Sequence, residues 1–112
     1  MEKLALYRKA IITILEEHAA YLPANFDQVE RQVFADTERD HYQLVTIGWQ
    51  KGTYIRNTLF HLDIKNGKIW LQYNGTEEDL GQRLQDMGVP KSDIVIGWLP
   101  PEARALSDYA VA

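Results

Sequence analysis

The sequence predicts an α+β domain: an N-terminal helix, a four-stranded antiparallel meander, a second helix and a short C-terminal extended segment. Three observations predict it. Apolar side chains recur every three or four residues over positions 2–20, as on one face of a helix. Two runs with strand composition flank Asn66-Gly67, which is the strongest short-range signal for a β-hairpin. A helix-start pattern, Thr76 to Asp79, follows at once.

The first helix is predicted over Glu2 to Ala20. Its apolar stripe needs burial against another layer, so we expect the helix to pack on the sheet. His18 ends the stripe and is interpreted as a histidine at the boundary of the core. The stripe consists of Leu4, Tyr7, Ile11, Ile14, Leu15 and His18.

Four strands are predicted between the helices, because β-branched and aromatic residues alternate there with polar ones. Polar or glycine-containing stretches separate the first three strands, as antiparallel hairpins require. The strands span Phe26 to Asp36, Asp40 to Trp49, Tyr54 to Ile64 and Lys68 to Tyr73.

The Asn66-Gly67 turn fixes the pairing of the last two strands. Both central residues of a type I′ turn need positive φ, which Asn and Gly tolerate best. The two-residue loop pairs Ile64 with Ile69 and Leu62 with Leu71, and places His61, Asp63, Trp70 and Gln72 together on the opposite face.

The second helix is predicted to start at Thr76 as N-cap and to end at Gly88 as the C′ residue. Leu80, Leu84 and Met87 form its buried stripe. Ile94 to Ile96 is either a short buried strand or a packed extended segment. No structure is assigned to Leu106 to Ala112.

Two registers are open for the second and third strands. A two-residue Lys51-Gly52 loop pairs Tyr42 with His61 and Asp40 with Asp63, whereas a three-residue loop puts His41 opposite His61. The first register is favoured because it gives one apolar face. That face would hold Val45, Ile47 and Trp49 beside Phe60, Leu62 and Leu71.

In this register six residues gather on the other face and form the candidate site: Asp40, Tyr42, His61, Asp63, Trp70 and Gln72. Two carboxylates near an imidazole suit metal binding or acid–base chemistry. A solvated sheet face or an interface with aromatic anchors is favoured over such a site. The interface is the prediction, since Tyr42 and Trp70, with Leu44 and Leu59, would lie on a face that the helices leave uncovered. We therefore expect self-association or docking of a protein partner through this face.

Composition narrows the function further. The 112 residues suffice for one domain, residues 1–112. A net charge of −4 offers few phosphate contacts, so we expect no strong direct DNA binding.

The sequence has no cysteine and matches no phosphate loop, zinc signature or nucleophile elbow, so no catalytic, metal or cofactor residues are assigned. Neither a signal peptide nor an apolar run of about 18 residues is found, and a cytoplasmic protein without a membrane span is expected.

Three segments together resemble one protein family. They are FADTERDHYQLVTIGW (Phe34 to Trp49), HLDIKNGKIWLQYNGTE (His61 to Glu77) and GVPKSDIVIGW (Gly88 to Trp98) followed by PPEAR and the closing Tyr-Ala-Val-Ala. In this order they resemble the fdxN element excision controlling factor family, the XisI-like proteins. The likeness covers nearly the whole chain. The end departs mildly, since Tyr109 stands where the family pattern has phenylalanine.

The resemblance implies an accessory or controlling role, with companion factors, in site-specific excision of a DNA element. It implies that the protein is not the recombinase, and it supplies no catalytic residues. The expected partner is a companion excision factor or the recombinase. The alternative is a small enzyme, or a metal- or ligand-binding protein, that uses Asp40, His61 and Asp63.

Overall fold

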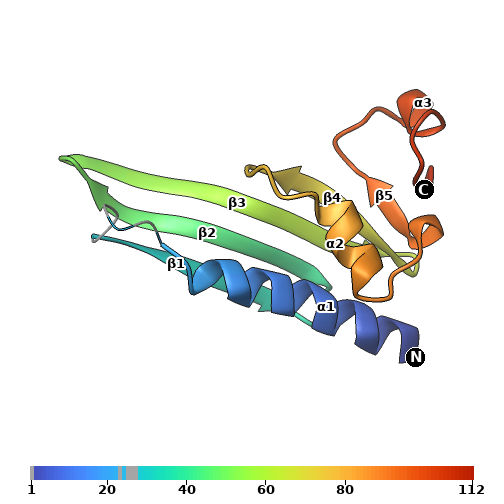
Figure 1. Ribbon diagram of the computed structural model, residues 1–112, viewed down its shortest axis with the longest axis horizontal. Coiled ribbons are helices and arrows are strands. Elements are labelled where there is room, and N and C mark those ends of the chain that lie inside the picture. The colour runs from blue at the N-terminus through green and yellow to red at the C-terminus, as the bar shows by residue number, and fades with distance from the viewer. Residues whose placement is uncertain (1, 23, 25–27) are drawn as a thin grey trace.

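The computed structural model describes residues 2–22, 24 and 28–112. Phe26 and Asp27, where the first strand was predicted to begin, lie outside these residues. Figure 1 shows the order of the elements. They are α1 (Glu2–Ala19), β1 (Val29–Asp36), β2 (His41–Gln50), β3 (Thr53–Lys65), β4 (Lys68–Asn74), α2 (Leu80–Asp86), the 3-10 turn η1 (Lys91–Asp93), β5 (Ile94–Ile96) and α3 (Pro101–Arg104).

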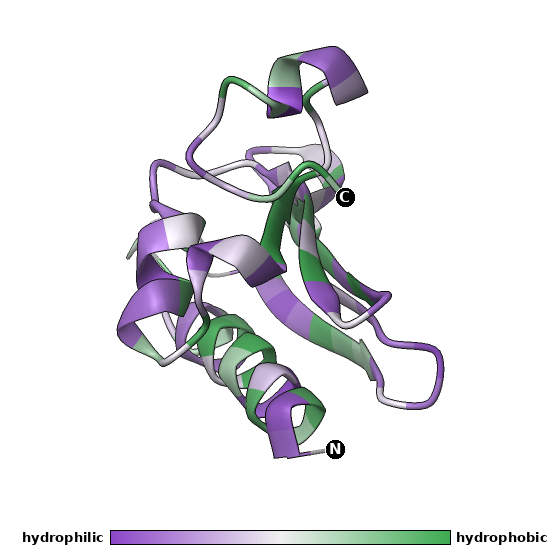
Figure 2. Cartoon of the chain, turned by 90° about the vertical axis from the view of Figure 1, so that its right-hand side faces the viewer, coloured by the Kyte–Doolittle hydropathy of each residue, from purple (hydrophilic) through white to green (hydrophobic). Residues whose placement is uncertain are grey.

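The strands form one five-stranded sheet in the order β1-β2-β3-β4-β5, and α1 and α2 lie on the same side of it (Figures 1 and 2). The first four strands are antiparallel neighbours, as predicted. The chain then crosses through α2, and β5 pairs parallel with β4. The predicted α+β class is confirmed, and Ile94 to Ile96 adds a fifth strand to the predicted four. Of the helices in the described part of the chain, none combines the length and apolarity that crossing a membrane requires.

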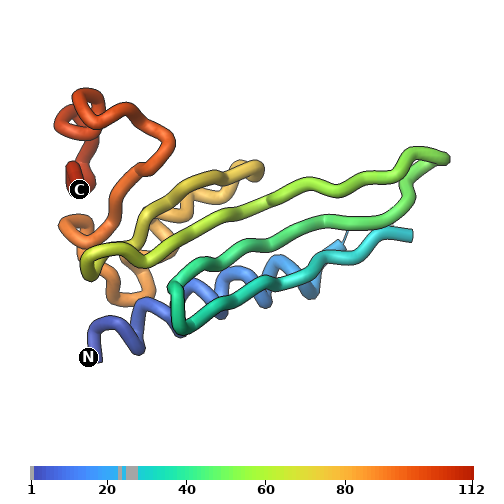
Figure 3. Tube along the Cα trace, turned by 180° about the vertical axis from the view of Figure 1, so that it is seen from behind, coloured from blue at the N-terminus to red at the C-terminus, as the bar shows by residue number. Residues whose placement is uncertain are grey.

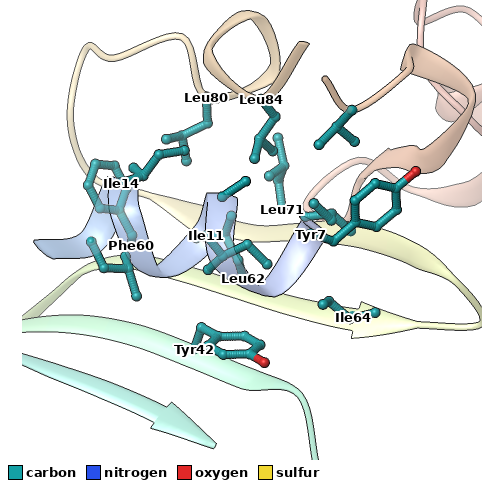
Figure 4. Close-up of a cluster of buried hydrophobic side chains, with 14 of the residues drawn as sticks. Tyr7, Ile11, Ile14, Tyr42, Phe60, Leu62, Ile64, Leu71, Leu80 and Leu84 are labelled. Carbon is teal, nitrogen blue, oxygen red and sulfur yellow. The ribbon is translucent and has the colours of Figure 1, made fainter. Parts of the chain in front are cut away.

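The core lies between the sheet and the two helices (Figure 4). The stripe predicted for α1 is confirmed: Tyr7, Ile11, Ile14 and Leu15 are buried, and α1 ends at Ala19. These side chains meet the inner face of the sheet, which is the face toward α1 and α2. That face contributes Tyr42, Leu44, Phe60, Leu62, Ile64, Ile69, Leu71 and Ile94, and α2 adds Leu80 and Leu84.

The β3–β4 hairpin has the predicted turn and register. Asn66 and Gly67 both have positive φ, 54° and 77°. Ile64 pairs with Ile69, and Leu62 with Leu71. The register then shifts, so that His61 faces Tyr73 and Gln72 is the extra residue on β4.

The β2–β3 hairpin contains a β-bulge that neither predicted register includes. Its two-residue loop is as predicted, with Gln50 paired to Thr53. Val45 pairs with Thr58, but Leu44 pairs with Phe60, so Leu59 is an extra residue on β3. Below the bulge Tyr42 therefore faces Leu62 and His41 faces Asp63. Both registers proposed from the sequence are wrong in this half of the hairpin.

The bulge decides which side chains of β2 face the helices. Because a slip of one residue exchanges the two faces of a strand, Tyr42 and Leu44 enter the core and are fully buried. Leu59 also packs against the core. Val45, Ile47 and Trp49 lie on the opposite face, so their predicted place beside Phe60, Leu62 and Leu71 is wrong, as is the predicted outward position of Tyr42, Leu44 and Leu59.

The helix α2 begins later than predicted. Its N-cap is Asp79, whose carboxylate accepts a hydrogen bond from the Gln82 amide at 3.0 Å. Thr76 instead donates its hydroxyl to Asn74 Oδ1 at 2.8 Å and belongs to a turn that precedes the helix. The predicted C-terminus is confirmed: Gly88 has φ of 100° and closes a Schellman motif, with Val89 N bonded to Leu84 O.

The C-terminal segment returns to the sheet. The Ala110 amide donates to the Ile94 carbonyl at 2.8 Å, and Ala110 forms a parallel bridge with Val95. The hydroxyl of Tyr109 lies where a side chain on Gly81 of α2 would stand. The segment Leu106 to Ala112, to which the sequence assigns no structure, therefore covers the edge of β5 that faces away from β4.

Replacing the central core residue Leu62 by Ala should lower the free energy of unfolding by about 2–5 kcal/mol, because the side chain is completely buried between α1 and the sheet. Urea denaturation followed by circular dichroism measures this loss. Leu106→Ala is the control, since Leu106 is 90% exposed and should change stability by about 0.5 kcal/mol at most. A loss below about 1 kcal/mol for Leu62→Ala would contradict its place in the core.

Candidate interaction face of the sheet

The face of the sheet turned away from α1 and α2, here called the outer face, is the candidate site (Figure 3). Cross-strand pairing sets its side chains in rows. One row holds Phe34, Gln43, His61 and Tyr73, and the next holds Asp36, His41, Asp63 and Trp70. The tip of the β2–β3 hairpin, which reaches beyond the helices in Figure 1, adds Ile47, Trp49, Tyr54 and Arg56.

Asp63 lies at the centre of the outer face and is only 7% exposed. One carboxylate oxygen, Oδ1, is bonded to His41 Nδ1 at 2.9 Å and to His61 Nε2 at 3.0 Å. The other, Oδ2, accepts from Gln72 Nε2 at 3.2 Å. The bulge on β3 and the extra residue on β4 bring these four side chains together from three strands.

Burial alone would raise the pKa of Asp63, because a charged carboxylate loses water there. The hydrogen bonds from His41, His61 and Gln72, and the charge interaction with His61, outweigh burial. The pKa of Asp63 is therefore held below its ordinary value, and the carboxylate is charged at neutral pH.

Trp70 pairs with Asp63 across the strands, and its ring lies close to two cationic groups. Lys65 Nζ lies 4.4 Å from the centroid of its ring, and the Arg104 guanidinium carbon lies 4.9 Å from it. Arg104 also donates to the carbonyl of Val111 at 3.4 Å. Trp70 thus anchors the C-terminal segment to the sheet and is less open to a partner than the sequence suggests.

Other aromatic rings on the outer face are about half exposed. Phe34 is 48% and Tyr73 is 50% exposed, and they stand at the two ends of one cross-strand row. Trp49 and Tyr54, at 54% and 50%, meet edge to face with ring centroids 5.3 Å apart. A hollow of about 380 Å³ beside Phe34 is lined by Val33, Phe34, Ala35, Asp36, His41 and Gln43.

Two of the six predicted site residues lie on the inner side of the sheet. Tyr42 is fully buried and donates its hydroxyl to Asp40 Oδ1 at 2.8 Å. Arg8 of α1 binds both oxygens of Asp40, at 2.9 and 3.1 Å. This bonding to Arg8 is the main reason that the pKa of Asp40 is lowered, and it joins α1 to the β1–β2 turn.

The structure therefore brings together His61, Asp63, Trp70 and Gln72 as predicted, adds His41, and removes Asp40 and Tyr42. A signal for the bulge is present in the sequence. Phe60, Leu62 and Ile64 follow the two-residue apolar period of a strand, but Leu59, directly before Phe60, is apolar as well. Two consecutive apolar residues break that period, as an extra residue at a bulge does.

The alternative ligand site of Asp40, His61 and Asp63 is not assembled, because Asp40 lies on the other side of the sheet from Asp63. Within residues 2–22, 24 and 28–112, no three or more His, Asp or Glu side chains are placed to hold a metal ion. His41 and His61 both direct a nitrogen at the same oxygen of Asp63, which makes the group a hydrogen-bonded network.

The fold and this face define a small α+β protein whose sheet presents a polar and aromatic outer surface. The XisI family model, described as XisI protein, matches residues 1–111. The chain belongs to the XisI family, as the resemblance in its sequence indicated.

Two solved structures are similar over nearly the whole chain. The crystal structure of a XisI-like protein from Anabaena variabilis ATCC 29413 shares 41% identity with a TM-score of 0.89, covering 97% of this chain and 99% of that one. The fdxN element excision controlling factor XisI from the same organism shares 29% identity with a TM-score of 0.82, covering 98% and 99%. Among curated proteins, no match to the chain is found.

Replacing Asp63 by Asn should reduce the free energy of unfolding at pH 7 by about 1.5–3 kcal/mol, the usual net contribution of hydrogen bonds to a charged group. Because the pKa of Asp63 is lower in the folded than in the unfolded state, its contribution is present above the unfolded pKa of about 3.9 and is lost as the pH falls through the folded pKa. The difference between wild type and variant should therefore shrink below about pH 4.

Urea unfolding at pH 7 and pH 3 measures both effects. Glu77→Gln is the control, because Glu77 is exposed and its loss should leave the pH dependence unchanged. A difference between wild type and Asp63→Asn that is equally large at both pH values would show that the charge of Asp63 does not stabilise the fold.

Proposed function

We propose that this protein is an accessory, controlling factor in site-specific excision of a DNA element, and that it acts by binding protein partners and not as the recombinase. The observation that carries the proposal is membership of the XisI family over residues 1–111. Similarity to the fdxN element excision controlling factor XisI of Anabaena variabilis adds the link to excision.

The outer face supports binding of a protein. Half-exposed Phe34 and Tyr73 frame a row whose middle is polar, and aromatic groups among hydrogen-bonding groups are typical of protein interfaces. The buried Asp63 network fixes the positions of His41, His61 and Gln72 before any partner arrives, so little side-chain entropy remains to be lost on binding.

The charge of the chain also supports a protein partner. The 12 basic and 16 acidic residues leave a net charge of −4. Of the cationic side chains near the outer face, Lys65 and Arg104 are engaged with Trp70. We infer that the companion excision factor or the recombinase is the macromolecule that meets this face, and that contact with DNA is made by that partner.

Replacing Tyr73 by Glu should weaken binding to the companion excision factor by about tenfold or more, because a half-exposed aromatic anchor contributes over 1 kcal/mol to many interfaces. Isothermal titration calorimetry with the purified companion factor, and in parallel with the recombinase, measures the change.

Leu106→Glu is the matched control, since it also puts a carboxylate in place of an exposed apolar side chain, but Leu106 lies on the C-terminal segment and on none of the strands that carry the outer face. Unchanged affinity for both proteins after Tyr73→Glu and after Trp49→Glu would exclude the outer face as the docking surface. Absence of binding by the wild type to either protein would overturn the proposed mode of action.

The purified protein alone should bind DNA only weakly at physiological salt, because its acidic balance supplies few counterion-releasing contacts. Fluorescence anisotropy with a labelled duplex containing the excision site, and with an unrelated duplex, tests this. Sub-micromolar affinity for either duplex would contradict a function exerted through partners.

A further inference from the structure

The two edges of the sheet differ. The edge at β5 is three residues long and is covered by the C-terminal segment through the bond from Ala110 to Ile94. The edge at β1 is eight residues long, and no described strand pairs with it on the side away from β2. Natural proteins seldom leave a long, regular edge strand uncovered.

The backbone groups that β1 leaves free can be identified. Trp49 N donates to Gln28 O at 3.0 Å, so Gln28 belongs to a hydrogen-bonded pair with β2. Because such pairs alternate along an antiparallel ladder, the even-numbered residues of β1 bond to β2. The amides and carbonyls of Val29, Arg31, Val33 and Ala35 therefore point away from β2, toward the open edge.

The hollow of about 380 Å³ on the outer face opens at this edge. Four consecutive β1 residues, Val33 to Asp36, line it, together with His41 and Gln43 of β2. Phe34 borders the hollow and is 48% exposed. Free backbone groups, an exposed aromatic ring and a hollow thus coincide within one stretch of four residues.

We propose that β1 pairs antiparallel with β1 of a second copy of this chain, with the twofold axis at Phe34, so that the two sheets join into one of ten strands. This isologous contact goes beyond the proposed function and uses an edge that the Tyr73 end of the outer face does not share. Strand addition to an exposed edge is an established mode of recognition, in which main-chain hydrogen bonds supply affinity.

The side chains of β1 fit this register with themselves. Phe34 meets Phe34 of the other copy on the outer face. The unpaired amide and carbonyl of Val33 exchange hydrogen bonds with those of Ala35 in the other copy. Gln32, which now donates to Glu30 Oε2 at 3.0 Å, comes opposite Asp36 and can donate to its carboxylate. No two like charges stand opposite each other between residues 32 and 36.

Two other registers bring like charges together. With the axis at Val33, Glu30 would face Asp36, and like charges directly opposite are destabilising. With the axis at Arg31, two arginines would face each other. A basic segment of another protein would also satisfy the acidic side chains of β1, and the experiment separates that occupant from a second copy.

The chain has no cysteine, so a single introduced thiol reports on the pairing. Opposite residues of a non-hydrogen-bonded antiparallel pair have Cα atoms about 4.5 Å apart, which is within the range of a disulfide. Phe34→Cys should form a covalent dimer on mild oxidation, seen on non-reducing gels. Gln32→Cys is the matched control on the same strand and face, and it should give no covalent dimer, because in this register each Gln32 faces Asp36 of the other copy and the two thiols lie too far apart.

Sedimentation velocity over roughly a hundredfold range of concentration tests the free edge without a thiol. The wild type should shift toward twice the monomer mass of 12.9 kDa as concentration rises. Ala35→Pro should remain monomeric, because proline removes an amide that points to the edge and leaves the β1–β2 bonds intact. Ala35→Thr keeps that amide and should dimerise like the wild type. Circular dichroism checks that each variant is folded.

A wild type that is monomeric at every concentration overturns the proposal, as does cross-linking of Gln32→Cys in preference to Phe34→Cys. If the wild type is monomeric and Ala35→Pro abolishes binding of the companion factor, the edge belongs to that partner and not to a second copy. Binding of the companion factor by a folded but monomeric Ala35→Pro protein would leave the proposed function standing and separate the two contacts.

Discussion

The extra residue Leu59 in β3 is the constraint on which the rest of the structure depends. It lets the two halves of a long hairpin follow different registers around a correctly formed Lys51-Gly52 turn. Below the bulge, Tyr42 and Leu44 come to lie on the same side as Phe60 and Leu62, so α1 has a continuous apolar surface to cover. The same shift sends His41 outward to Asp63. Core and outer face are therefore set by one irregularity, and neither can change register without the other.

Features that depend on neighbouring residues were predictable from the sequence. The apolar stripe of α1, the Asn66-Gly67 turn and the Gly88 helix end all follow from local geometry, and all three are confirmed. The error in register arises where distant residues decide. The Lys51-Gly52 turn predicts an outward-facing Tyr42 only if its register continues along the whole β2–β3 hairpin, and the bulge at Leu59 ends that register at Val45. The N-cap is a separate, local error: Thr76 and Asp79 are both suitable caps, and the pattern does not show that Asn74, two residues before Thr76, binds the Thr76 hydroxyl.

The C-terminal motifs that carried the family resemblance have a structural part in this chain. Arg104, the last residue of PPEAR, stacks on Trp70 and reaches the Val111 carbonyl. Ala110, within the closing Tyr-Ala-Val-Ala, bonds to β5, and Tyr109 lies over Gly81 of α2. These contacts cover one sheet edge, although the residues of this segment are themselves exposed or only partly buried. The motifs that identify the family in the sequence thus cover the β5 edge of the sheet.

The sharing of one Asp63 oxygen by two imidazoles has a consequence for what a partner must offer. An ionised carboxylate can only accept hydrogen bonds, so His41 donates through Nδ1 and His61 through Nε2. When the rings are neutral, this fixes the tautomer of each, and His41 Nε2 and His61 Nδ1 become acceptors. These two nitrogens then accept hydrogen bonds only from donor groups such as amides, hydroxyls or guanidinium.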